Sequence, residues 1–149
     1  MKSLSTVVRS LTLAGLTTLG MTLAVNPSPV QAAQATTFIA LVNAGQEVPP
    51  GSGTGAGVAY LTLGSDDKLC VSFTFGGLTG TLAAAHVHGP ATPGVNAGIL
   101  FALPTANPIN TCVGPLDKAQ KKDLRKGLFY LNVHSSVVPA GEIRGQIEP

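Results

Sequence analysis

The chain has 149 residues and a formal net charge of +2, from nine Lys and Arg residues against seven Asp and Glu residues. Two of the basic residues, Lys2 and Arg9, lie in an N-terminal segment that we expect to be removed, so the rest of the chain is close to neutral. It carries no basic patch with interleaved aromatic side chains, which excludes a nucleic-acid-binding surface of that kind. The remaining chain, about 115 residues, is long enough for one domain with its own core.

The first 32 residues have the pattern of a secretory signal peptide. Lys2 and Arg9 form the basic start, and the uncharged apolar stretch 11–25 follows. Small residues make Val30-Gln31-Ala32 a cleavage site and Ala33-Gln34-Ala35 a second one, so we expect cleavage after residue 32 or 35. The protein is then exported to the periplasm or the extracellular space. An uncleaved anchor is the alternative, but the apolar run is short and no membrane span is expected in the mature chain.

Seven segments favour β-strands, because they are rich in Val, Ile, Leu, Phe and Thr and are separated by Gly, Pro, Asn and Asp. The expected strands are 37–43, 56–64, 68–75, 82–89, 97–103, 127–134 and 141–148. Residues 64–67 predict a hairpin turn between the second strand and the third. The stretches 49–55, 90–96 and 104–115 are expected to be loops.

One short helix is predicted at about 117–126, because this segment contains no Gly, Pro or β-branched residue. Asp117 favours the N-terminal end of the helix and Gly127 is a natural stop. A narrow stripe of Leu116, Gln120 and Leu124 predicts that the helix lies over one edge or end of a β-structure. Many short strands with a single helix indicate an all-β fold, an antiparallel, Greek-key-like β-sandwich or flattened barrel.

The two cysteines, Cys70 and Cys112, predict a disulfide, because an even count in an exported protein favours pairing. The bridge would close a loop of about 40 residues. Two free thiols are the alternative. Metal ligation by the cysteines is disfavoured, because their spacing matches no zinc motif.

All three histidines lie in strand-like runs. Residues i and i+2 of a strand point to the same face, so His86 and His88 project together. His134 shares a face with Tyr130 and Asn132, opposite an apolar face. In the last run, Ile143, Gly145 and Ile147 are expected to face inward and Glu142, Arg144 and Gln146 outward. The histidines and the arginine are therefore expected on polar strand faces, which form either a solvent-exposed surface or a site.

Three histidines indicate a transition-metal site, because imidazole suits copper, zinc, nickel or iron. We predict that His86, His88 and His134 are the ligands, provided that the fold brings their strands together. The alternative is structural: His86 and His88 form hydrogen bonds with loop carbonyls or with Glu142. No Gly-x-Ser-x-Gly elbow and no phosphate-binding loop is found, and no catalytic residue is predicted.

Glu142 and Arg144 are expected on one strand face, as outer groups of the site that guide an anionic ligand toward the histidines. An ordinary surface pair or cross-strand partners are the alternative. Glu47, on a proline-rich loop, is expected to cap a turn. Backbone geometry at turns and at a close strand approach explains Gly89, Gly141 and Gly145.

Four motifs occur in order: Gly45-Gln46-Glu47-Val48-Pro49-Pro50, Ala85-His86-Val87-His88-Gly89-Pro90, Gly127-Leu128-Phe129-Tyr130-Leu131-Asn132-Val133-His134 and Pro139-Ala140-Gly141-Glu142-Ile143-Arg144-Gly145-Gln146. Together they resemble the CHRD domain, which is named for its repeats in chordin and also occurs as a stand-alone exported domain in bacteria. The resemblance covers residues 37–149 and implies an exported single domain of β-sandwich type. It implies no particular reaction.

A second resemblance is local. His86-Val87-His88 and Val133-His134 are similar to the copper-ligand strands of copper/zinc superoxide dismutase, and Arg144 is placed like the arginine that steers its anionic substrate. The chain has three histidines in all, so the bridging histidine and the zinc loop of that family have no counterpart. The resemblance therefore excludes a zinc site of that kind and is compatible with a mononuclear copper site.

The function favoured by the sequence is an exported binding protein that holds a transition metal, with copper preferred. One alternative is a metal-free module that binds an extracellular protein or glycan. Another is a copper-dependent redox enzyme of superoxide dismutase type. The proximity of His134 to His86 separates the two metal hypotheses from the metal-free one.

Overall fold

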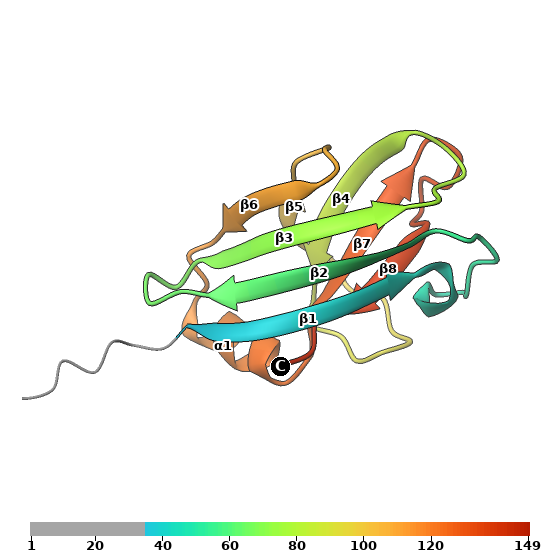
Figure 1. Ribbon diagram of the computed structural model, residues 1–149. Helices are drawn as coiled ribbons and strands as arrows, with labels where there is room; N and C mark the ends of the chain where they lie inside the picture. The colour runs from blue at the N-terminus through green and yellow to red at the C-terminus, as the bar shows by residue number, and fades with distance from the viewer. Residues whose placement is uncertain (1–34) are drawn as a thin grey trace, which may run out of the picture. The chain divides into compact units, whose positions relative to one another are not determined.

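Eight strands, a short helix and a 3-10 turn make up the part of the chain that the computed structural model describes, residues 35–149 (Figure 1). In chain order they are β1 (Thr36–Asn43), η1 (Ala44–Gln46), β2 (Ala56–Leu63), β3 (Leu69–Gly76), β4 (Leu82–His88), β5 (Ile99–Leu103), β6 (Ile109–Val113), α1 (Lys118–Arg125), β7 (Tyr130–Ser135) and β8 (Ile143–Gln146). The predicted signal peptide lies outside the described residues. Among residues 35–149, no helix is long and apolar enough to cross a membrane.

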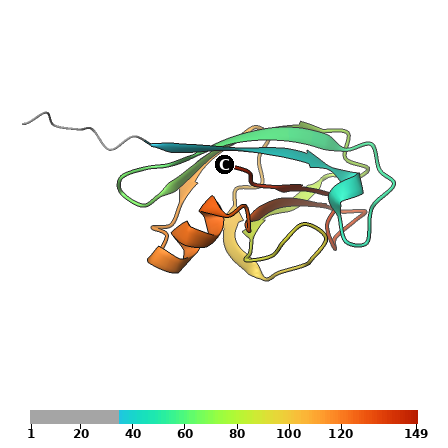
Figure 2. The same ribbon diagram turned by 90° about the horizontal axis from the view of Figure 1, so that it is seen from below.

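The strands form one antiparallel sheet in the order β5-β4-β7-β8-β1-β2-β3-β6. The edge strands β5 and β6 contact each other, so the sheet nearly closes into a barrel. Figure 2 shows how it folds into two layers, with β1, β2 and β3 in one and β4, β7 and β8 in the other. After β5 the chain crosses to pair β6 with β3, and it then returns to place β7 beside β4. The predicted fold class is confirmed.

Alternating burial builds the core between the two layers, as β3 illustrates. Its inward side chains are fully or almost fully buried: Leu69, Val71, Phe73 and Phe75. Its outward side chains are half-buried or exposed: Cys70, Ser72 and Thr74. Each fully buried large apolar side chain contributes about 1.5–3 kcal/mol to folding, so this alternation sets which face of the strand is inside.

The expectation of a loop over residues 104–115 is wrong in its middle, where β6 pairs with β3. Ile109 pairs with Phe73 and is completely buried. The segment is short and flanked by prolines, which is why it resembles a loop in sequence. The prolines at 108 and 115 lie outside the strand, and β6 is an edge strand with one hydrogen-bonded partner. Pairing with β3 therefore decides its conformation.

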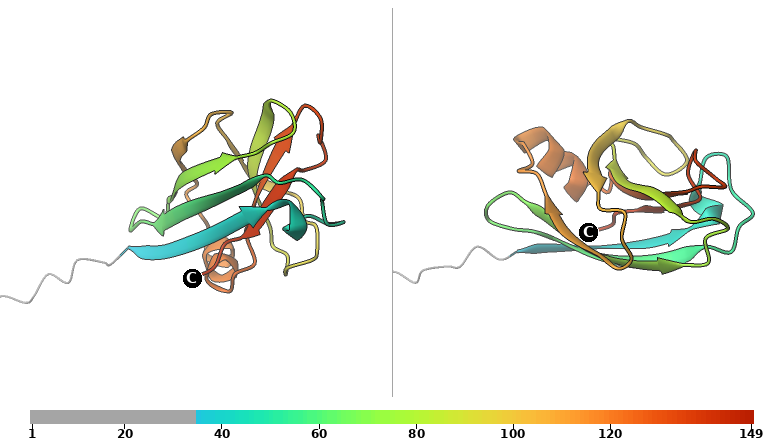
Figure 3. Two further views of the ribbon diagram at one scale, coloured as in Figure 1. Left: turned by 45° about the vertical axis from the view of Figure 1, so that its right-hand side comes forward. Right: turned by 90° about the horizontal axis from the view of Figure 1, so that it is seen from above.

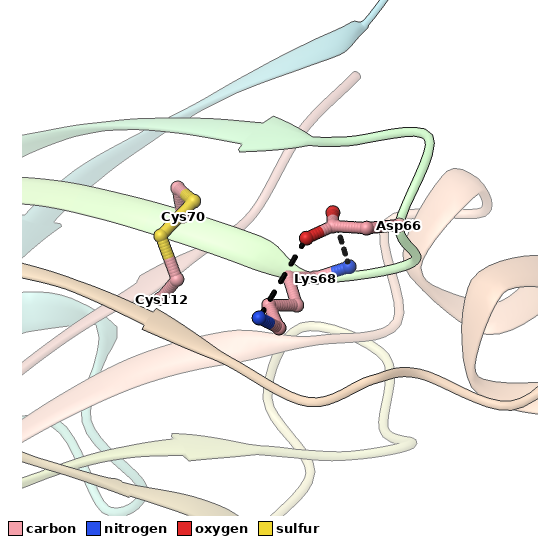
Figure 4. Close-up of a disulfide and its surroundings, with 4 residues drawn as sticks. All are labelled: Asp66, Lys68, Cys70 and Cys112. Atoms are coloured by element: carbon pink, nitrogen blue, oxygen red, sulfur yellow. Dashed lines mark hydrogen bonds and ion pairs between the residues drawn. A yellow bond between two sulfur atoms is a disulfide. The ribbon is translucent and has the colours of Figure 1, made fainter.

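The disulfide joins Cys70 in β3 to Cys112 in β6, directly opposite each other in the ladder (Figure 4). This confirms the predicted pairing. In the adjoining turn, the Lys68 backbone N–H donates to the Asp66 carboxylate at 3.3 Å. The bridge lies on the outer face of the strands, so it ties the edge strand to the sheet without occupying core volume.

The helix α1 lies at one end of the layers, near the C-terminus (Figure 3). The Asp117 side chain accepts from the Gln120 N–H at 2.8 Å, and the Gln120 side chain accepts from the Asp117 N–H at 2.9 Å. This capping box fixes the start of the helix. Leu116 and Leu124 are buried in the core, as the predicted stripe required.

Candidate functional site

The structure brings all three histidines together on neighbouring strands. His86 and His88 project from β4, and His134 projects from β7 on the same face, because β4 and β7 pair with His86 opposite Asn132. One ring nitrogen from each histidine lies within 4.8 Å of the others. The condition set by the sequence, that the two strands be neighbours, is fulfilled.

Backbone carbonyls hold the protonation pattern of two of the rings. His88 Nδ1 lies 3.0 Å from the Ala97 carbonyl oxygen, and His134 Nδ1 lies 3.0 Å from the Pro139 carbonyl oxygen. A carbonyl only accepts, so each Nδ1 carries the proton and each neutral ring keeps an Nε2 lone pair. A histidine that donates one nitrogen to a carbonyl and presents the other is arranged as metal-ligating histidines are.

The Nε2 lone pairs of His134 and His88 differ in their hydrogen-bond partners. His134 Nε2 lies 3.0 Å from His86 Nδ1, and because His134 Nε2 is unprotonated, the His86 Nδ1–H donates to it. His88 Nε2 is buried and has no hydrogen-bond partner among the described residues. A buried acceptor without a partner is uncommon, because it loses its hydrogen bond to water without replacement.

A metal ion fits this arrangement if the rings shift toward one another. Two nitrogens bound to one tetrahedral ion at about 2.1 Å each lie about 3.4 Å apart. The three nitrogens lie within 4.8 Å of one another, so the widest pair would have to close by up to about 1.4 Å. Rotation of the half-buried His86 and His134 rings supplies such a shift, and His86 would lose its Nδ1 proton to bind through that atom.

The surroundings favour the neutral form of His86 and of His88. Burial lowers the pKa of His86, and His134 and His88 lower it further. Burial is also the largest cause of the lowered pKa of His88; the hydrogen bond to Ala97 opposes it, while His134 and Arg144 add to it. Metal ligation requires the neutral ring, so these shifts reduce competition from protons.

Tyr130 and Arg144 support His88 from behind. The Tyr130 ring stacks on His88, with centroids 4.9 Å apart and planes 8° from parallel. The Arg144 guanidinium lies 3.6 Å from the Tyr130 ring centroid, in a cation–π contact. The Tyr130 hydroxyl donates to the Ala97 carbonyl, which also receives the His88 Nδ1–H. Tyr130 and His88 are thus held by the same carbonyl.

The expectation that Glu142, Arg144 and Gln146 face outward is wrong. Arg144 is only 1 % exposed, and the other two are also buried. Loop residues cover this face: Arg144 donates to the Val95 carbonyl at 2.8 Å and to the Asn96 side chain at 3.1 Å. Asn96 in turn donates to the Val48 carbonyl, tying the two covering loops together. Strand alternation identifies the two faces, but it does not show whether loops cover the second one.

Glu47 joins this covered layer instead of capping a turn with its side chain. Asn132 Nδ2 donates to Glu47 Oε2 at 3.2 Å, and the carboxylate is buried. The turn is closed by the Glu47 backbone N–H, which donates to the Ala44 carbonyl. Burial raises the pKa of Glu47, and Asn132, Arg144 and Val48 oppose that shift. The Glu47 carboxylate therefore lies near Arg144. The sequence did not predict that these two residues are neighbours.

The structure places Glu142 in a different environment from the histidines. Its Oε1 accepts the Thr79 backbone N–H. Burial tends to raise the pKa of Glu142, but the nearby Ser135 and Thr79 lower it overall. None of the hydrogen bonds of residues 35–149 joins Glu142 to a histidine. Arg144, by contrast, lies on the Tyr130 ring that stacks on His88, and after burial its charge is one of the causes of the lowered pKa of His88.

Sequence reasoning missed the loop contributions to the site. The backbone carbonyl of Ala97 orients His88, and that of Pro139 orients His134. The Asn96 side chain orients Arg144. A backbone carbonyl carries no residue-specific signal, so nothing in the sequence marks Ala97 or Pro139. Tyr130 had a signal, because it shares a strand face with His134.

The fold and the site define a small all-β domain with a cluster of three histidines on two neighbouring strands. The family model of the CHRD domain matches residues 38–147, and the chain belongs to this family. Neither a curated protein nor a solved structure matches the chain. The local resemblance to superoxide dismutase therefore rests on the short motifs alone.

Proposed function

We propose that this CHRD domain is an exported protein that binds a transition metal, with copper preferred, through His86, His88 and His134. The observation that carries the proposal is the buried Nε2 of His88, which has no hydrogen-bond partner and lies in a cluster with ring nitrogens of the other two histidines. A metal ion would satisfy this lone pair and the lone pair of His134 together. Hydrogen bonding to carbonyls alone accounts for the Nδ1 atoms but leaves His88 Nε2 unexplained.

Copper is preferred because a set of imidazoles without a carboxylate suits it, and because divalent copper binds such nitrogen sites most tightly among the first-row metals. A bound copper ion would supply Lewis acidity or one-electron chemistry. The chain's own residues would bind the ion and orient the imidazole rings. Ala97 and Pro139 hold two rings in the required tautomer. Burial lowers the pKa of His88, and the Arg144 charge adds to this effect.

The test is a titration of Cu²⁺ and Zn²⁺ into the mature domain without a His-tag, by competition with a chromophoric chelator. Paramagnetic resonance of the copper form gives a second readout, because hyperfine lines from three nitrogens identify the ligands. We expect one tight equivalent of copper and loss of at least about a hundredfold in affinity on His88→Ala. The triple variant His86→Ala/His88→Ala/His134→Ala should bind no stoichiometric metal.

The matched control is Asp66→Asn/Asp67→Asn, which removes neighbouring carboxylates far along the chain from the histidines. This variant should bind copper as the wild type does. Equal, weak binding by the wild type and the triple variant would reject the metal proposal and leave the histidines with a structural role.

Export is the second part of the proposal. The disulfide between Cys70 and Cys112 supports it, because such bonds persist in oxidising compartments. The cleavage sites at residues 32 and 35 precede β1, which begins at Thr36, so processing would leave the domain whole. Mass spectrometry of protein from a fractionated expression host should find a chain that begins at Ala33 or Thr36 outside the cytoplasm. A full-length chain in the cytoplasmic fraction would contradict this.

An apolar strip on the outer face favours a second candidate function, binding of an extracellular protein or glycan. Leu41 and Tyr60 are each 63 % exposed, and Ile39 pairs directly with Tyr60 across β1 and β2. Exposed aromatic and aliphatic side chains side by side are typical of binding surfaces. Tyr60→Ser/Leu41→Ser should abolish binding in a glycan-array or extracellular-protein screen while copper binding is unchanged. A screen in which wild type and variant bind the same set would reject this candidate.

A further inference from the structure

Glu142 is a buried carboxylate that is only half satisfied. Its side chain is 3 % exposed. Oε1 accepts the Thr79 N–H, whereas Oε2 is buried and has no hydrogen-bond partner. Among residues 35–149, the ion pairs join Lys68 to Asp66 and Lys121 to Asp67, and none reaches Glu142. Burying an unpaired charge is costly unless another group compensates for it.

The carboxylate nevertheless stays ionised. Burial alone would raise its pKa, but the neighbouring Ser135 and Thr79 outweigh burial and lower the pKa overall. Glu142 therefore carries a negative charge at neutral pH. Protonation of Oε2, which would remove the need for a cation, is disfavoured by the same contacts.

The carboxylate borders a cavity of about 440 Å³. The wall is built from small and apolar residues: Gly51, Ser52, Gly53, Thr79, Val137, Val138, Gly141 and Glu142. Glu142 is the only charged residue of this wall. Val137, at the rim, is 63 % exposed. The cavity thus combines an apolar entrance with a single buried anion.

We propose that this cavity binds a primary ammonium group carried on a short apolar stem. An ammonium ion in the cavity has three donors and would neutralise the carboxylate. Oε2 is closed to water in this structure, so a small rotation of the carboxylate would have to turn it toward the ammonium. The stem would contact Val137 and Val138. Ca²⁺ fits less well, because it takes 6–8 oxygen ligands and the wall offers one carboxylate.

Two sources share this chemistry, a free alkylamine and the lysine side chain of a partner protein. Both present an ammonium at the end of a methylene chain. The site is independent of the metal proposal, because its residues do not include a histidine and no hydrogen bond within residues 35–149 joins Glu142 to one. Failure of either proposal leaves the other standing.

The experiment is a titration of the isotope-labelled mature domain followed by the amide signals of Thr79, Gly53 and Gly141. The probes are n-butylammonium, n-butanol as the uncharged control, a capped Gly-Lys-Gly peptide, and the same peptide with norleucine in place of lysine. We expect saturable shifts with the ammonium and none with butanol. Shifts with the lysine peptide but not its norleucine counterpart would assign the ligand to a protein, and shifts with the free amine alone would assign it to a small molecule.

Variants locate the binding. Glu142→Gln keeps the acceptor for the Thr79 N–H but removes the charge, and it should weaken ammonium binding at least about tenfold. Val138→Phe fills the cavity and leaves the carboxylate in place, so it keeps the test informative if Glu142→Gln does not fold. Glu47→Gln is the matched control at another buried carboxylate and should bind as the wild type does. The proposal is overturned if the wild type shows no saturable shift up to about 50 mM ammonium, or if Val138→Phe and Glu142→Gln both bind unchanged.

Discussion

Gly141 lies beside the buried Asn132 and Glu47 and also lines the cavity next to Glu142. Its conformation explains why a glycine is needed there. Its φ is +135°, a region that side chains rarely adopt. A Cβ at this position would lie 2.8 Å from Asn132 Oδ1 and 3.0 Å from Glu47 Oε1. The backbone must therefore pass close to the buried amide and carboxylate, whereas the sequence predicted only a turn at this glycine.

Gly141→Ala should reduce the free energy of unfolding by about 1–3 kcal/mol, because strain and displacement of the Asn132–Glu47 pair add together. Urea denaturation measures the change. Gly98→Ala is the matched control, since a Cβ there meets nothing within 4 Å and the position has no positive φ. Equal loss in both variants would mean that the close approach at Gly141 is unimportant.

The two lowered histidine pKa values predict a pH dependence of the metal-free domain. The pKa of His86 and of His88 lies below 6.5 in the folded protein, so the unfolded chain binds more protons as the pH falls. Their contribution to stability is therefore complete above pH 6.5 and is lost as the pH decreases through the lowered folded values. Denaturation with a chelator present should show decreasing stability from neutral to mildly acidic pH.

The histidine variants isolate this effect. In His86→Gln/His88→Gln the slope of stability against pH should flatten. Glu47 has a raised pKa and contributes a slope of the opposite sign, losing stability as the pH rises through its folded value. The comparison is therefore made in a Glu47→Gln background. An unchanged slope after removal of both histidines would contradict the assignment.

At the scale of elements, β6 depends on covalent attachment to β3. It is an edge strand of five residues with one hydrogen-bonded neighbour. Cys70→Ser/Cys112→Ser opens a loop of 42 residues in sequence and should cost about 3–4 kcal/mol in the chain-entropy model. Hydrogen exchange should show the loss of protection concentrated in Ile109–Val113.

A neighbouring pair on the same two strands provides the comparison. Ser72 Oγ and Asn110 Oδ1 form a hydrogen bond of 2.9 Å across β3 and β6. Ser72→Ala/Asn110→Ala should cost no more than about 1 kcal/mol. A disulfide variant that is no less stable than this one would show that the bridge contributes nothing beyond an ordinary cross-strand contact.

At the scale of the whole molecule, metal binding should be coupled to folding, because β4 and β7 must both be in place to bring the three histidines together. At a free copper concentration of a hundred times the dissociation constant, the stabilisation should approach about 2.7 kcal/mol. Thermal denaturation with and without copper measures it. The triple histidine variant should show no stabilisation, and a copper-dependent increase in that variant would place the metal elsewhere.

The strand pattern could be predicted where alternation is strong and consecutive strands pair as hairpins. The runs that became β1, β2 and β3 were predicted to within a residue or two at each end, and the helix was predicted from its cap and its stop. Residues 97–98 and 127–129 were assigned to strands but lie outside β5 and β7. The backbone of these residues lies next to loops and the end of the helix. The period of apolar residues along the sequence does not show such neighbours.

The chain's own sequence determined the alternating faces, the disulfide partners, the helix with its cap and the set of three histidines. These depend on local chemistry, on residue spacing and on a count of cysteines. Only the tertiary structure decided that β4 lies beside β7, that loops bury Arg144, and that Glu142 faces a cavity instead of the histidines. Strand order and loop coverage arise from contacts between residues far apart in the chain, and no local pattern encodes which of two polar faces will be covered.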